Sequence, residues 1–306
     1  MSTLLLTRTD VQHAMDALTL LEEMRAAFRA DSTRPGDEPP PASVATGLAG
    51  GLQVSLPGAL PGIPACSVKV EHGDGRGVVH LYARDTGALL AVMEAGHLAA
   101  LAQGVVGALA ADVLARPDAS RVALIGAGPS ASMQLKSLRL VRGLQHVRVY
   151  DAQPVRGVDF AARMYKALNL PVRPAMSVEE AVEDADVVIT ATGSAEPLLF
   201  PGMVRAGTHI SALGAQGPGR AEVAPGLLRQ SSFFCDAPAR AAVLGEAPVP
   251  TALGAVLAGA APGRRDVAEV TIFGGMRPAW QDLVAAWHVY QGVRGDDAAR
   301  RLDLEA

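Results

Sequence analysis

The feature that most constrains the fold is a glycine-rich turn between a strand-like and a helix-like segment. The apolar run Val122-Ala123-Leu124-Ile125 is followed directly by Gly126-Ala127-Gly128-Pro129-Ser130-Ala131. In this spacing the first glycine permits a tight turn, the second lets the backbone approach a pyrophosphate, and the final alanine lets a helix pack close to the strand. The free N–H groups at the helix N-terminus attract phosphate. The run therefore predicts a strand, turn and helix that bind a dinucleotide through Gly126, Ala127, Gly128, Pro129 and Ser130.

An acidic residue follows at the position that such a turn requires. The apolar segment 147–150 ends in Asp151, 25 residues beyond Gly126. A carboxylate there accepts hydrogen bonds from ribose hydroxyls and repels the 2′-phosphate of NADP. Ala152 and Gln153 offer no guanidinium, whereas Arg156 is close enough in sequence to meet a phosphate. We expect NAD as the cofactor, with NADP less favoured. The alternative is a glycine turn of a flavodoxin-like sheet that binds no dinucleotide.

Strand-like and helix-like segments alternate along the second half of the chain. The strand-like runs are 122–125, 147–150, 187–191, 208–213 and 270–273. The helix-like segments are one that begins near Ser130, 160–168 and 177–185, and Ser177 with Glu180 fits a capping box at the start of the last one. Alternation of this kind predicts an α/β fold with a Rossmann-type doubly wound parallel sheet. We place this domain at residues 116–278.

The residues outside this domain follow other patterns. Apolar residues repeat at helical spacing over 11–28, after Thr9 or Asp10 as a possible cap. Four β-rich runs separated by turn residues predict an antiparallel sheet: 52–56, 65–70, 78–83 and 89–93. A buried helix is predicted over 97–114 and an amphipathic one over 279–293. Residues 1–115 with 279–306 therefore form a predicted second, α+β domain.

Composition excludes several classes of partner. The formal net charge of the 306 residues is −4, and no dense run of Lys and Arg is interleaved with aromatic residues, so a nucleic-acid partner is not expected. No stretch of about 18 uncharged apolar residues predicts a membrane span. The first residues lack a signal-peptide pattern, which favours the cytoplasm. Cys66 and Cys235 have no zinc-binding spacing, so we expect no metal site and read both as buried apolar residues.

The order of several segments resembles the ornithine cyclodeaminase/mu-crystallin family over nearly the whole chain. These segments are 63–70 around Lys69, 81–91, 98–118, 125–128, 189–194, 209–222 and Asp282-Leu283. The resemblance implies an oxidoreductase that passes a hydride between NAD(P) and the α-carbon of an amino acid or cyclic imine. It also implies a homodimer built from the N-terminal domain and the C-terminal helix. Cofactor contacts are then expected from Thr192, Gly193, Leu213 and Gly214.

The resemblance also implies an active-site lysine, Lys69, beside the reacting nitrogen and carboxylate of the substrate. A lysine in a cleft can lose its proton when desolvated, or hold a carboxylate when charged. Without the resemblance, the simpler interpretation is a solvated lysine on a strand.

Two substrate-side positions depart from the family. Ala102-Gln103 stands where the family usually has Arg-Thr, so the arginine that holds the substrate carboxylate is missing. Gln216 stands where the family usually has an aspartate, and we take Gln216 as the candidate catalytic residue at that position. Arg277, directly before Pro278, is expected in the first turn of the last helix. It can replace part of the lost carboxylate contact, or else point to solvent or pair with Asp282.

These observations predict an NAD-dependent, ornithine cyclodeaminase-like oxidoreductase that acts on an amino acid, cyclic imine or ketimine. The substrate-side changes indicate an altered small-molecule substrate. The alternative is a mu-crystallin-like protein that binds NAD and a ligand without catalysis.

Overall fold

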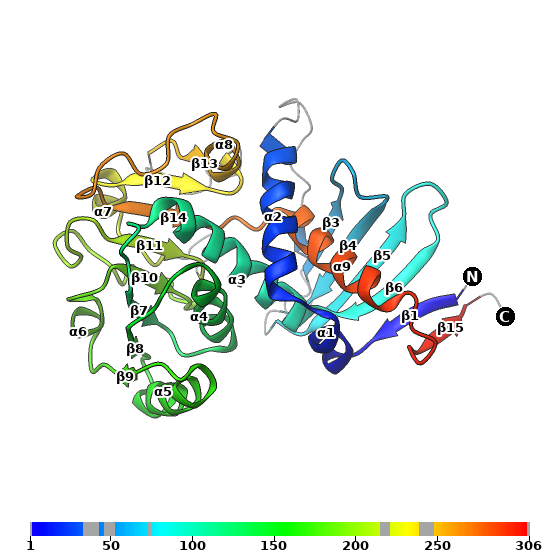
Figure 1. Cartoon of the computed structure of the whole chain (residues 1–306), viewed down its shortest axis with the longest axis horizontal. Coiled ribbons are helices and arrows are strands. Elements are labelled where there is room, and N and C mark those ends of the chain that lie inside the picture. The colour runs from blue at the N-terminus through cyan, green and yellow to red at the C-terminus, as the bar shows by residue number, and fades with distance from the viewer. Residues whose placement is uncertain are drawn as a thin grey trace. The chain divides into compact units, whose positions relative to one another are not determined.

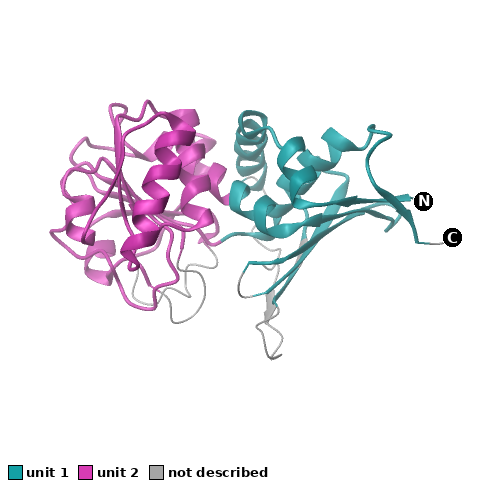
Figure 2. Ribbon diagram, turned by 90° about the horizontal axis from the view of Figure 1, so that it is seen from below, with its two compact units in different colours: residues 1–102, 277–306 teal, residues 103–276 magenta. Residues whose placement is uncertain are grey.

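The computed structural model describes residues 2–32, 43–45, 53–72, 75–214, 221–238 and 248–304. The chain divides into two compact units (Figure 2), residues 1–102 with 277–306 and residues 103–276. The sequence-based domain limits fall at 115/116 and 278/279 instead. Helix α3 (Ala95–Leu114), which the sequence assigns to the first domain, is therefore shared between the two units.

Eight strands form a sheet in the second unit, in the order β13-β12-β14-β11-β10-β7-β8-β9, and all its pairs are parallel. They are β7 (Arg121–Ile125), β8 (His146–Tyr150), β9 (Val172–Pro174), β10 (Val187–Thr190), β11 (His209–Ala212), β12 (Ser232–Cys235), β13 (Thr251–Ala252) and β14 (Thr271–Gly274). The chain runs outward from β7 to β9 and in the other direction from β10. The strand order thus reverses between β7 and β10, and the predicted Rossmann-type doubly wound sheet is confirmed.

Helices cover both faces of this sheet (Figure 1). They are α4 (Pro129–Val141), α5 (Pro154–Leu168), α6 (Val178–Val182), α7 (Pro225–Arg229) and α8 (Leu253–Leu257). Along β7, Leu124 packs in one core with Leu135 and Phe160, whereas Ile125 packs in the other core with Val182. Successive residues of a strand point to opposite faces, so β7 is apolar throughout because both of its faces are covered.

Two helix starts in this unit follow from local sequence. Helix α5 begins six residues before the predicted segment 160–168, because Pro154 fits the first helical turn. The hydroxyl of Ser177 accepts a hydrogen bond from the N–H of Glu180 at 3.1 Å, so the Ser177 half of the predicted capping box of α6 is present. The Glu180 carboxylate accepts from the N–H of Met176 instead of the N–H of Ser177.

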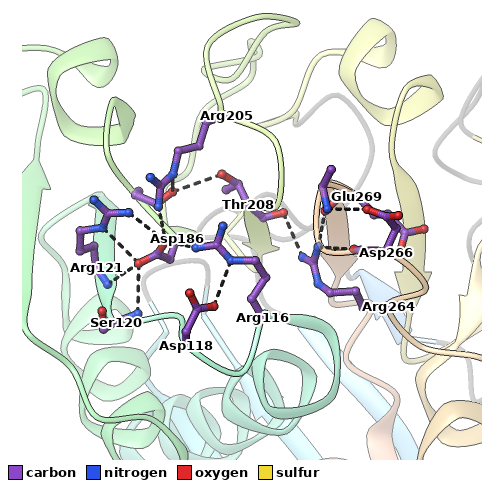
Figure 3. Close-up of polar contacts among 12 residues, drawn as sticks. Arg116, Asp118, Ser120, Arg121, Asp186, Arg205, Thr208, Arg264, Asp266 and Glu269 are labelled. Atoms are coloured by element: carbon purple, nitrogen blue, oxygen red, sulfur yellow. Dashed lines mark hydrogen bonds and ion pairs between the residues drawn. The ribbon is translucent and has the colours of Figure 1, made fainter.

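At the amino-terminal edge of the sheet, Asp186 gathers three arginines (Figure 3). The Oδ1 atom of this buried residue lies 2.5 Å from Nη2 of Arg116 and also pairs with Arg205, while Oδ2 lies 3.2 Å from Nε of Arg121. The backbone N–H groups of Ser120 and Arg121 donate to Oδ2. Burial raises the pKa of Asp186, but the hydrogen bonds and charge of Arg121 outweigh it and lower the pKa to about 2. This carboxylate therefore ties β7, β10 and the segment before β11 together.

The first unit contains a mixed sheet of seven strands, in the order β15-β1-β6-β5-β4-β3-β2. They are β1 (Ser2–Leu6), β2 (Ser43–Ala45), β3 (Gln53–Gly58), β4 (Ala65–Glu71), β5 (Gly77–Ala83), β6 (Leu89–Glu94) and β15 (Arg301–Asp303). Strands β3 to β6 pair antiparallel, as predicted, and β2, which was not predicted, pairs antiparallel with β3. The prediction missed β1, which pairs parallel with β6 and antiparallel with β15. Its apolar trio is too short for alternation to be visible.

Three helices pack with this sheet: α1 (Arg8–Ala14), α2 (Ala17–Ser32) and α9 (Ala279–Val293). The prediction of α9 is confirmed. The prediction of one helix capped by Thr9 or Asp10 is wrong, because Thr7 caps α1 and the backbone is extended at Met15. Asp16 then accepts hydrogen bonds from the N–H groups of Leu18 and Thr19 and starts α2.

Helix α9 is held closely against the strands and α2 (Figure 1). A Cβ atom at Gly58 of β3 would lie 2.4 Å from the carbonyl oxygen of Ala279, so only glycine permits this approach. The rings of Phe28 and Trp280 meet edge to face, with 4.9 Å between their centroids. Residues at the start of α9 are therefore fixed relative to β3 and β4.

Helix α3 is long and apolar, although no membrane-spanning segment was predicted from the sequence. Within the described ranges it is the one helix long and apolar enough to cross a bilayer. Of its apolar window, 83% is buried inside the protein, which is the state of a core helix.

The two cysteines differ in burial. Cys235 is buried as expected, whereas Cys66 is only half-buried.

Candidate functional site

The glycine turn adopts the conformation that a dinucleotide requires. Gly126 has a φ of 104°, in the left-handed region that favours glycine, and a Cβ atom there would lie 2.6 Å from the carbonyl oxygen of Ala191. Gly128 is the N-cap of α4 and Pro129 its first residue, while Ala131 is fully buried. The turn therefore leads into the N-terminus of a 13-residue helix, as phosphate binding demands.

Asp151 is fixed to this turn by hydrogen bonds from the backbone. Its Oδ2 atom accepts from the N–H of Ala127 at 2.8 Å, and Oδ1 accepts from the N–H of Gln153 at 2.9 Å. The side chain is only 9% exposed. Each carboxylate oxygen has two lone pairs, so both can still accept a hydrogen bond from a ribose hydroxyl. The acid therefore stands where a ribose-binding residue is needed, at the carboxyl end of β8.

A guanidinium lies close to this carboxylate. Nε of Arg156, in the first turn of α5, is 3.9 Å from Oδ2 of Asp151. Arg156 also lines a pocket of about 410 Å³ with Ala127, Asp159, Ala162 and Arg163. A nearby positive charge offsets part of the repulsion that Asp151 exerts on a phosphate. Asp151 therefore repels a 2′-phosphate less strongly than it would without Arg156 beside it.

Glu222, which was not predicted as a site residue, joins the two loops that carry the other predicted cofactor contacts. Its buried Oε1 atom accepts from N and Oγ1 of Thr192, at 2.8 and 2.6 Å. Its Oε2 atom accepts from Oγ1 of Thr190 at 2.8 Å and from the N–H of Gly214 at 2.9 Å. One carboxylate thus holds the loops after β10 and β11, which contain Thr192, Gly193, Leu213 and Gly214. In the sequence, Glu222 is only an acidic residue directly before an apolar segment. Such residues are common on protein surfaces, so this pattern did not predict a buried role.

Gln103 is a second residue whose role the sequence did not reveal. Its buried side chain donates to the carbonyl oxygen of Leu213 at 2.6 Å and accepts from the hydroxyl of Ser130 at 3.2 Å. In the sequence, Gln103 is recognisable only as a departure from the family pattern. In the structure, Gln103 connects α3 with the glycine turn and with the loop after β11.

Lys69 is buried in β4 of the first unit, with 5% exposure. Its Nζ atom lies 2.9 Å from Oδ2 of Asp282 and 3.3 Å from Oε1 of Glu71. The interpretation of a solvated strand lysine is therefore wrong. Two carboxylates at contact distance therefore offset the cost of burying this side chain.

Asp282 lies in the first turn of α9 and is buried. Burial raises its pKa, but the charges of Lys69 and Arg277 and the hydrogen bond from Lys69 outweigh it, so the pKa is lowered. Arg277 has a φ of 50° and lies before the N-cap Pro278, outside the helical turn in which we expected it. Lys69 and Arg277 therefore act on the same carboxylate. Gln216 and the following Gly217-Pro218-Gly219 lie outside the described residues.

The fold and the turn define a Rossmann-type dinucleotide-binding protein with a second, α+β unit. Residues 72–297 match the model of the ornithine cyclodeaminase/mu-crystallin family, and the chain belongs to this family. The alanine dehydrogenase of Archaeoglobus fulgidus is 32% identical over 231 residues, which are 71% of this chain and 70% of that protein.

Two solved structures are similar over nearly their whole length. An archaeal alanine dehydrogenase dimer with bound NAD has a TM-score of 0.89 and 27% identity, covering 99% of this chain and 100% of that one. The Δ1-pyrroline-2-carboxylate reductase of Thermococcus litoralis, in complex with NADH and L-proline, has a TM-score of 0.86 and 26% identity, covering 95% and 97%. The predicted family and fold class are thus confirmed, and the homologues are oxidoreductases that bind NAD(H).

Proposed function

We propose that the protein is an NAD-dependent oxidoreductase that transfers a hydride at a carbon–nitrogen bond of a small molecule. It would reduce an imine or ketimine in one direction and dehydrogenate an amino acid in the other. The observation that carries the proposal is the complete nucleotide turn, in which Gly126 has a positive φ and Asp151 is tied to Ala127. The names of the relatives, which include alanine dehydrogenase and pyrroline-2-carboxylate reductase, support the reaction class.

The chemistry assigns distinct tasks to cofactor and protein. When bound, NADH supplies the hydride that reaches the imine carbon. Reduction of the C=N bond also requires a proton at nitrogen, which Lys69 can donate as a buried cation. A carboxylate on the substrate needs a cationic partner, and Ala102 removes the arginine of the family. We propose that Arg277 contributes to this contact and that Gln216 takes the position of the family's acid.

The cofactor proposal is NAD rather than NADP. Asp151 is held rigidly by two backbone N–H groups, so its negative charge stays where a 2′-phosphate would lie. Arg156 reduces this effect without removing the carboxylate. We also propose that the protein is a homodimer, which the dimer of the archaeal alanine dehydrogenase supports. The cytoplasm is the location that we propose from the sequence pattern.

The test is oxidation of NADH with a panel of cyclic imines and of 2-oxo acids supplied with ammonia or methylamine. Lys69→Met should lower turnover by about 100-fold or more, whereas Lys136→Met at an exposed lysine should not. The wild type, Lys69→Met and Lys136→Met should bind NADH with equal affinity. Absence of NADH binding would refute the proposal. Thermal stabilisation by panel compounds without turnover would support the binding-protein alternative instead.

A further inference from the structure

The charged cluster around Lys69 determines how this residue can act. In β4 the residues that are buried alternate along the strand: Ala65, Ser67 and Lys69. A cation thus occupies a position that the alternation would give to a small or apolar side chain. Burying a charge is costly unless opposite charges compensate it.

Two carboxylates provide that compensation from different elements. Asp282 comes from α9 and lies at 2.9 Å, while Glu71 comes from β4 itself and lies at 3.3 Å. The neighbouring strands add no charge at this position, since Ser55 of β3 and Val79 of β5 are the register partners of Lys69. Among the described residues, these two carboxylates are the acidic groups paired with the ammonium.

Asp282 is the better placed of the two carboxylates. Its side chain is 12% exposed, against 17% for Glu71, and it lies closer to Nζ. It is also stabilised as an anion by the charge of Arg277 and by the N-terminal end of α9. Asp282 therefore remains negatively charged throughout the neutral pH range, with a fixed position against β3 and β4.

We propose that Asp282 is a positioning residue that keeps Lys69 as an ammonium ion, so that Lys69 meets the substrate as a cation and proton donor rather than as a neutral base. The encounter with substrate rests on the proposed function, whereas the charge state of Lys69 does not. In the reductive direction, the proton leaves Nζ for the substrate nitrogen while the hydride reaches the carbon. Lys69 then regains a proton from water.

The test follows the proton on Lys69 directly. The chain has only three lysines, Lys69, Lys136 and Lys166, so protein with isotope-labelled lysine ε-carbons gives three assignable NMR signals. In Asp282→Asn, the titration midpoint of Lys69 should fall by about 1 to 3 pH units, because a buried ammonium has lost its nearest anion. The midpoints of Lys136 and Lys166, which are both exposed, should stay unchanged.

Further variants separate positioning from folding. Asp282→Glu should restore most of the wild-type midpoint, and Glu71→Gln should give a smaller shift than Asp282→Asn. Asp112→Asn removes a 2.8 Å ion pair with Arg142 elsewhere and should leave Lys69 unaffected. If Asp282→Asn does not fold, Glu71→Gln is compared with Asp282→Glu. The titration midpoint of Lys69 should then shift more in Glu71→Gln than in Asp282→Glu.

Activity provides an independent readout with any imine that the wild type reduces. Turnover by Asp282→Asn should decline at a lower pH than in wild type, because the ammonium is lost earlier, while NADH affinity stays the same. A Lys69 midpoint that does not move in folded Asp282→Asn overturns the proposal. A midpoint that moves in a protein without turnover supports this proposal and counts against the proposed function.

Discussion

Replacing Asp186 by asparagine should destabilise the Rossmann unit in a way that depends on pH. The carboxylate is buried and holds Arg116, Arg121 and Arg205 together (Figure 3). Its position at the amino-terminal edge of the sheet is opposite to the glycine turn at the carboxyl edge. The substitution should therefore reduce stability and leave NADH affinity unchanged.

The magnitude follows from the pKa of Asp186. A decrease from 3.8 to about 2 on folding corresponds to about 2.4 kcal/mol of stability at pH 6. Because the folded pKa is the lower one, this stability is present above about pH 4 and is lost as the pH falls toward 2. At pH 3 about 1.3 kcal/mol remains by the same relation. The cost of Asp186→Asn should thus be about 1 kcal/mol smaller at pH 3 than at pH 6.

Urea denaturation at the two pH values measures this difference. Both tryptophans, Trp280 and Trp287, belong to the first unit, so tryptophan fluorescence does not report on the second unit. Far-UV circular dichroism, which records the helices of both units, is therefore the signal to follow. Buried His209, whose pKa is lowered to about 3 mainly by burial, also costs stability in acid, but equally in both proteins. Asp118→Asn is the matched control, because this exposed partner of Arg116 should contribute less than about 1 kcal/mol. An Asp186→Asn cost that is the same at pH 3 and pH 6 would refute the reasoning.

Three further predictions concern the cofactor and the assembly. Gly214→Ala should weaken NADH binding at least about tenfold, since its Cβ would lie 2.2 Å from the backbone N of Thr192; Gly143→Ala, where nothing lies within 4 Å, is the control for the same titration. In fluorescence titrations NADH should bind more tightly than NADPH, and Asp151→Ala should reduce this difference in affinity. Equal affinities of the wild type for NADH and NADPH would instead identify Arg156 as a phosphate ligand. Light scattering should show a dimer at micromolar concentration, and a monomer would contradict the assembly expected from the family.

The sequence was most informative where pattern and backbone geometry coincide. The glycine turn, the alternating segments after it and the last helix were all predicted, because each depends on residues close in sequence. The short strands β1, β2, β9, β12, β13 and β15 were not predicted. Of these, β1, β12 and β15 pair with partners far along the chain. The division of the first helix at Met15 was missed because Asp16 and Thr7 provide caps that the apolar repeat does not reveal.

The candidate site was predictable only in part, for a related reason. Lys69 could be selected because the segment around it resembles the family. Its burial and its two carboxylate partners, however, depend on how α9 packs against β4. Glu222 and Gln103 act through hydrogen bonds to backbone groups of distant loops. A donor or acceptor of that kind leaves no periodic signal in a sequence, so the supporting residues of the cofactor loops emerge only from the fold.

The residues that shape the cofactor side are chemically independent of those that the family uses to select a substrate. Asp151 and Glu222 act mainly on backbone N–H groups, at Ala127 and Gly214 among others, and these contacts do not require the arginine that Ala102 replaces. The charge of Lys69 is balanced by the carboxylates of Glu71 and Asp282. Both arrangements are therefore formed without that arginine.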